Sequence, residues 1–177
     1  MDIGRSRKTL IVVMVVALGF TFYFAYMHAV PGGKGIVYPE RLPPDASIVR
    51  VVEGEEAVKA SMGIHWNPGG TGIVEAVIVE YSDGTRLWAS RTAGDADEYL
   101  AAMIQKIQRY EGALPFKVLH KIDVRGVEVW VLMDKNVAGK THLVWSRSGL
   151  VVWVEVPPGK PDFQHYVEVL VEGVNYR

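Results

Sequence analysis

The chain has 177 residues, a formal net charge of −1 at pH 7 from 19 basic and 20 acidic side chains, and no cysteine. This composition excludes disulfides, zinc–thiolate sites, iron–sulfur clusters and cysteine nucleophiles. No basic run follows residue 8, so duplex nucleic acid is not an expected partner, because duplex binding needs a concentrated basic surface. The abundance of valine and the scarcity of Asn and Gln are compatible with a thermophilic source.

The first 30 residues carry the clearest pattern in the chain. Residues 10–27 contain no charged side chain. A helix of that length spans about 27 Å, close to the roughly 30 Å hydrocarbon thickness of a bilayer. Tyrosines near one end suit the membrane interface. We therefore predict a transmembrane anchor that contacts the lipid bilayer, marked by Leu10, Phe20, Tyr23 and Tyr26.

The charges around this segment predict its orientation. Residues 1–30 hold three basic residues and one acidic residue, a net charge of +2, whereas the remainder holds 16 basic and 19 acidic residues, a net charge of −3. The positive-inside rule then places the N-terminus in the cytoplasm and everything after residue 30 outside the cell membrane. A cleaved export signal is the alternative, but its apolar region is shorter, and Met27 stands where a cleavage site ending at Ala29 needs a small residue.

Three segments follow from this division of the chain. Residues 1–30 form the cytoplasmic N-terminus and the anchor. Residues 31–47, with four prolines and three glycines, are expected to be an irregular tether. Residues 48–177 are expected to form one extracytoplasmic α+β domain, because their length suits a single hydrophobic core.

Strands and helices are predicted within this domain from apolar periodicity and turn signals. Short apolar runs predict strands over 48–52, 73–81, 85–92, 115–122, 127–133, 141–146 and 150–156, and a short helix over 53–63. Asp95 is the expected N-cap of a long amphipathic helix, and Asp162 is the expected cap of a second one. The predicted fold is an antiparallel sheet of about six strands, with the two long helices packed on one face.

The tryptophans suggest a surface for a partner. Trp88, Trp130, Trp145 and Trp153 fall on predicted strands, and Trp66 precedes the loop 67–72. Aromatic side chains on strands usually stack within a core, but apolar residues occupy both faces of the hairpin 141–156. Because helices on one side cover only one face, we expect a protein partner on the other face or on the loop. We predict His65, Trp66, Trp145 and Trp153 as partner-binding residues.

Catalytic and metal-binding patterns are weak. His120, His142 and His165 are isolated in the sequence and form no local ligand pair, so they are only weak metal candidates. The glycine-rich loop lacks phosphate-binding spacing, no serine lies in a nucleophile motif, and the acidic clusters suit helix starts. We expect no catalytic residue, cofactor or metal. The favoured function is a membrane-anchored binding or accessory domain of a membrane or envelope complex. An extracytoplasmic hydrolase with a histidine-centred site and a homomeric envelope or filament subunit are the alternatives.

Overall fold

The computed structural model describes residues 35–64, 72–160 and 162–177. The predicted anchor at residues 10–27 lies outside these ranges. Within them, no helix is both long enough and apolar enough to span a bilayer.

The described chain is rich in strands and contains three helices. In chain order the elements are β1 (Ile36–Val37), β2 (Arg41–Leu42), β3 (Ala46–Glu53), α2 (Gly54–Ile64), β4 (Ile73–Tyr81), β5 (Arg86–Thr92), α3 (Ala96–Arg109), β6 (Phe116–Val124), β7 (Val127–Asp134), β8 (Thr141–Arg147), β9 (Leu150–Val156), α4 (Phe163–Gly173) and β10 (Asn175–Tyr176).

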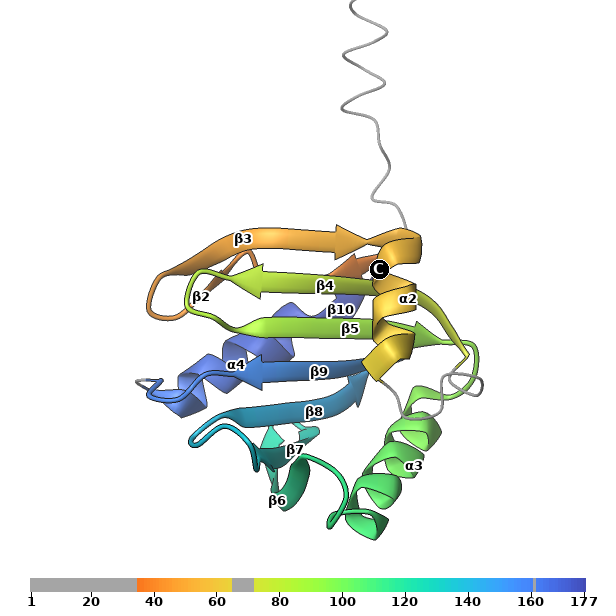
Figure 1. The fold of residues 1–177 in the computed structure, drawn as a ribbon. Helices are drawn as coiled ribbons and strands as arrows, with labels where there is room; N and C mark the ends of the chain where they lie inside the picture. Colours follow the sequence, from red (N-terminus) through yellow and green to blue (C-terminus); the bar gives the residue numbers. More distant parts are fainter. Residues whose placement is uncertain (1–34, 65–71, 161) are drawn as a thin grey trace, which may run out of the picture. The chain divides into compact units, whose positions relative to one another are not determined.

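Eight strands form one antiparallel sheet in the order β2-β3-β4-β5-β9-β8-β7-β6 (Figure 1). Two antiparallel runs, β2 to β5 and β6 to β9, meet where β5 pairs with β9. The helix α3 connects β5 in the middle of the sheet to β6 at its edge. A separate two-stranded sheet pairs β1 with β10, so both ends of the described chain meet.

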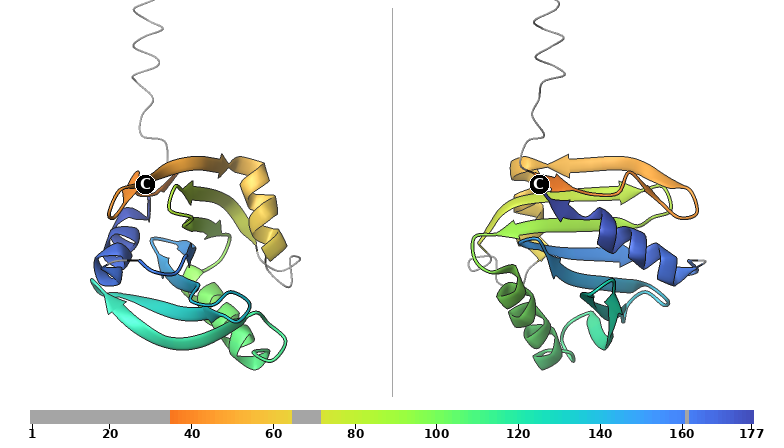
Figure 2. Two further views of the ribbon diagram at one scale, coloured as in Figure 1. Left: turned by 60° about the vertical axis from the view of Figure 1, so that its left-hand side comes forward. Right: turned by 180° about the vertical axis from the view of Figure 1, so that it is seen from behind.

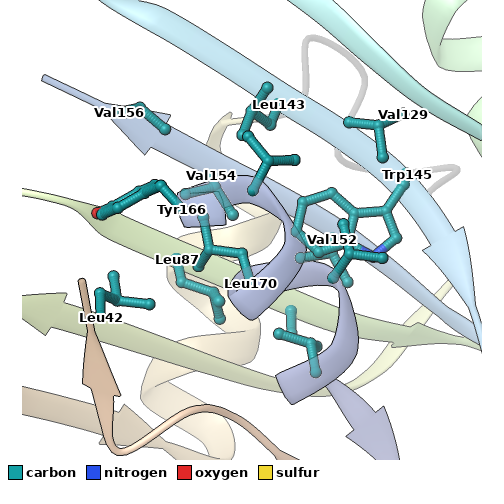
Figure 3. Close-up of a cluster of buried hydrophobic side chains, with 14 of the residues drawn as sticks. Leu42, Leu87, Val129, Leu143, Trp145, Val152, Val154, Val156, Tyr166 and Leu170 are labelled. Atoms are coloured by element: carbon teal, nitrogen blue, oxygen red, sulfur yellow. The ribbon is translucent and has the colours of Figure 1, made fainter. Parts of the chain in front are cut away.

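The helices lie on both faces of the sheet. In Figure 1, α2 and α3 lie in front of the sheet, and the view from behind in Figure 2 brings α4 to the front. The cluster beneath α4 contains Tyr166, Leu170 and Val171, packed against Leu87, Trp145 and other inward side chains of the central strands (Figure 3). Separate clusters pack beneath α3 and beneath α2 on the opposite face.

The predicted architecture is therefore wrong in two respects, although the α+β class is right. The main sheet has eight strands rather than about six, and the two long helices, α3 and α4, pack on opposite faces rather than on the same one. The physical reason is that both faces of the strands are apolar, so each face must be shielded from water. The chain supplies that cover itself. Moreover, β1 and β2 lie within the predicted tether at 31–47.

Candidate functional site

Three tryptophans lie in a row across the face that carries α2 and α3. Trp88 on β5 pairs with Trp153 on β9, Trp153 pairs with Val144 on β8, and Val144 pairs with Trp130 on β7. Direct cross-strand partners point to the same face of a sheet. Trp88 packs against the cluster under α2, whereas Trp153 and Trp130 pack against the cluster under α3. All three rings are only partly exposed, because they lie on the sheet beneath the helices.

Trp145 does not belong to this row. The prediction that Trp145 and Trp153 share one partner-binding surface is therefore wrong. Ser148 and Gly149 both adopt positive φ in the turn between β8 and β9, and Trp145 consequently pairs with Val152. Adjacent residues of a strand point to opposite faces, so Trp145 faces α4. Its side chain is 0% exposed in the core, which leaves no surface for a partner. Counting strand pairs outward from the turn at "RSG" would have placed Trp145 and Trp153 on opposite faces of the sheet.

His142 is the centre of a buried polar group on the α3 side. Its ring is 2% exposed. The indole N–H of Trp153 donates to Nδ1 at 3.0 Å, and Nε2 lies 3.4 Å from the Asp134 Oδ2. Phe116 packs edge-on against both rings, with centroids 4.9 Å from His142 and 5.0 Å from Trp153. Because Nδ1 accepts a hydrogen bond, the proton of the neutral imidazole lies on Nε2 and points to the carboxylate.

The electrostatic surroundings hold this histidine neutral. Burial lowers the pKa of His142, and the hydrogen bond to Asp134 opposes that change only in part. Burial alone would raise the pKa of Asp134, but hydrogen bonds from the Asn136 N–H and from His142 outweigh it, and the pKa falls below its ordinary value. Lys140 and Glu155 form an adjacent ion pair at 2.6 Å. With both nitrogens engaged, His142 connects β8 to β7 and β9 and has no free lone pair for a substrate or metal.

The remaining sequence-predicted residues do not join this group. His120 on β6 and His165 on α4 are exposed, and no three metal-ligating side chains converge anywhere in residues 35–64, 72–160 and 162–177. His65 and Trp66 lie outside the described residues, as do the anchor residues Leu10, Phe20, Tyr23 and Tyr26.

A second, partly buried polar group joins the β4–β5 turn to the start of α4, and no local pattern in the sequence indicates it. Asp83 accepts hydrogen bonds from Lys160 at 2.5 Å and from the Tyr166 hydroxyl at 2.9 Å. Tyr166 also bonds the hydroxyl of Thr85. Burial is the main cause that raises the pKa of the Tyr166 hydroxyl. The "SDG" turn placed Asp83 in a hairpin but gave no sign of Lys160, which lies 77 residues away. This group is a structural connection between sheet and helix.

The outer edge of β3 is largely unpaired. The strand pairs with β4 from Ile48 to Glu53, but with β2 only at Ala46 and Ser47. No other strand of the described ranges lies along the rest of this edge. Two of its side chains are apolar and exposed, Val49 at 63% and Val51 at 39%. Unpaired backbone groups with exposed valines are a template for another strand.

Comparisons with known proteins give no match: no protein-family model, no curated protein and no solved structure resembles the chain significantly.

Proposed function

We propose that residues 35–177 form a non-catalytic, partner-binding accessory domain of a membrane or envelope complex. Residues 10–27 would hold it at the cell membrane as a single-pass anchor, with the N-terminus in the cytoplasm and the domain outside. The charge-free apolar run and the preceding basic residues support the location.

The open edge of β3 is the observation that carries the binding role. Edge strands of soluble domains are commonly protected by lysines, bulges or a covering element. The edge strand β6 follows this rule, because Lys117 and Lys121 project from it and its register is interrupted between Val118 and His120. The free part of β3 is less protected: it has a register shift near Val49 and exposed charges at Arg50 and Glu53, but it has no lysine, and its valines at 49 and 51 are exposed. Such an edge is favourable for β-strand addition.

Neither alternative function draws comparable support. A histidine-centred hydrolase would require His142 to give up the hydrogen bond from Trp153 or the bond to Asp134 before a nitrogen could act on a substrate. A filament that grows head to tail through the sheet needs two complementary open edges, and the lysines of β6 protect one of them.

The proposal predicts that a second protein accompanies the full chain in its own membrane. The chain would be extracted from its native membranes in mild detergent through a C-terminal tag, and the mass and composition of the particle would be measured. The matched control fuses residues 1–34 to an unrelated soluble domain, so that it keeps the predicted anchor and loses the domain. We expect a partner in stoichiometric amount with the full chain only. The proposal would be contradicted if the same proteins were recovered with both chains. It would also be contradicted if no partner protein were recovered with either chain.

A further inference from the structure

We propose that the free edge of β3 pairs with the same edge of a second copy of this chain, which forms a two-fold dimer with a continuous sheet. The inference rests on the proposed function in one respect: it assigns the edge that carries the binding role to a second copy, so a further protein of the complex would bind the dimer elsewhere.

The direction of the side chains defines how two copies can meet. Val51 pairs with Val79, which is buried beneath α4, so Val51 points to the α4 side. Val52 pairs with Ile78 in the cluster beneath α2, so Val52 points to the α2 side. A two-fold axis perpendicular to the sheet keeps each face on its own side. The antiparallel pairing that centres on Val51 therefore places Val51 opposite Val51, and Arg50 opposite Val52.

The charges of the edge favour this antiparallel arrangement. Arg50 is its only basic residue, and the first turn of α2 directly after the strand carries Glu55 and Glu56. Within one chain the Arg50 Nη2 lies 3.9 Å from the Glu56 Oε1, and both side chains are largely exposed, so this ion pair is weak. In the antiparallel dimer each Arg50 lies beside the end of the other β3, near the acidic start of the other α2. A parallel arrangement would instead place Arg50 against Arg50, and like charges directly opposite are destabilising.

The other edge of the sheet does not allow an equivalent self-pairing. β6 presents Lys117 and Lys121, both exposed, so two copies of it would bring these cationic side chains together. Pairing β3 of one copy with β6 of the next would also leave open ends, whereas the two-fold arrangement closes. β3 is therefore the edge that suits a dimer.

Single cysteines in the full chain test the arrangement directly, because the natural chain has none. Val51→Cys places a thiol at the two-fold axis. Cross-strand partners have Cβ atoms about 4.5–5.5 Å apart, and a disulfide needs about 3.5–4.5 Å, so a small shift suffices. Leu119→Cys on β6 is the matched control, because Leu119 is 47% exposed and Val51 is 39% exposed. The variants would be oxidised in intact native membranes, and the covalent dimer measured on a non-reducing gel.

We expect the Val51→Cys chain to form a covalent dimer in severalfold greater yield than the Leu119→Cys chain. Adding Arg50→Glu to Val51→Cys should reduce that yield severalfold, because the introduced carboxylate is repelled by the acidic start of the partner's α2. Equal yields from the two cysteines, or a yield unchanged by Arg50→Glu, would overturn the inference. A tagged chain that recovers a different protein without forming the Val51 dimer would refute the inference and leave the proposed function standing. A Val51 dimer recovered with no second protein would support the inference and contradict the proposed accessory function.

Discussion

His142 illustrates how the surroundings of one residue determine its chemistry. Its Nδ1 accepts the indole N–H of Trp153, and its Nε2 faces Asp134. A proton added at Nδ1 would place two donors against each other in a buried site. The imidazolium form is therefore unfavourable in the folded chain, in agreement with the lowered pKa of His142.

This arrangement predicts that the fold loses stability in mild acid. The unfolded chain binds a proton at His142 near its ordinary pKa of about 6.5, whereas the folded chain binds it only at lower pH. The contribution is fully present above about pH 6.5 and is lost as the pH falls toward the lowered pKa of the folded state. We expect His142→Gln to reduce the fall in unfolding free energy between pH 7.5 and 5, measured by urea titration of the full chain in detergent with tryptophan fluorescence. Identical slopes for the two chains would show that His142 is not the group responsible.

At the scale of elements, α3 begins with the cap that the sequence predicted. The Asp95 carboxylate accepts the N–H of Asp97 at 2.7 Å and that of Glu98 at 3.1 Å. Leu100, Ile104 and Ile107 are buried against β7 and β8, as expected for an amphipathic helix. This helix covers the aromatic group around Trp153, so its stability affects the whole α3 face.

Removal of the cap tests this account of α3. Asp95→Ala should lower the free energy of unfolding by about 1 kcal/mol, because two backbone N–H groups lose their acceptor. Asp95→Asn keeps a capping oxygen and should remain close to the natural chain. Urea unfolding of the full chain in detergent at neutral pH measures both. An equal loss in the two variants would indicate that the negative charge, rather than the cap, stabilises the helix.

Local signals explain which elements were predictable. The strands 73–81 and 150–156 form as expected, and the other predicted strands begin and end within two residues of the predicted limits. These limits depend on the alternation of apolar residues and on turn residues, and both are local signals in the sequence. The pairing of β5 with β9 joins residues more than 50 positions apart and has no local signal. The two-residue strands β1 and β2 are too short for any periodicity. The partners of His142 were missed for the same reason, since Trp153 is joined to it only by the register of β8 and β9.

At the scale of the whole molecule, the chain covers both faces of its own sheet. The apolar residues on both faces of the strands predicted a partner on the second face, but α4 occupies one face and α2 with α3 the other. What remains open within the described ranges is an edge rather than a face. A partner that adds a strand at β3 would extend the sheet without disturbing either helix layer.

The retention of residues 10–27 is the claim on which the membrane-anchored account depends most directly. The decisive measurement is the intact mass of the natural chain recovered from carbonate-washed membranes. The account predicts that the chain remains with the membranes at its full 19.6 kDa. A soluble chain whose mass lacks the first 30 or so residues would contradict the account and would identify the apolar segment as a cleaved export signal.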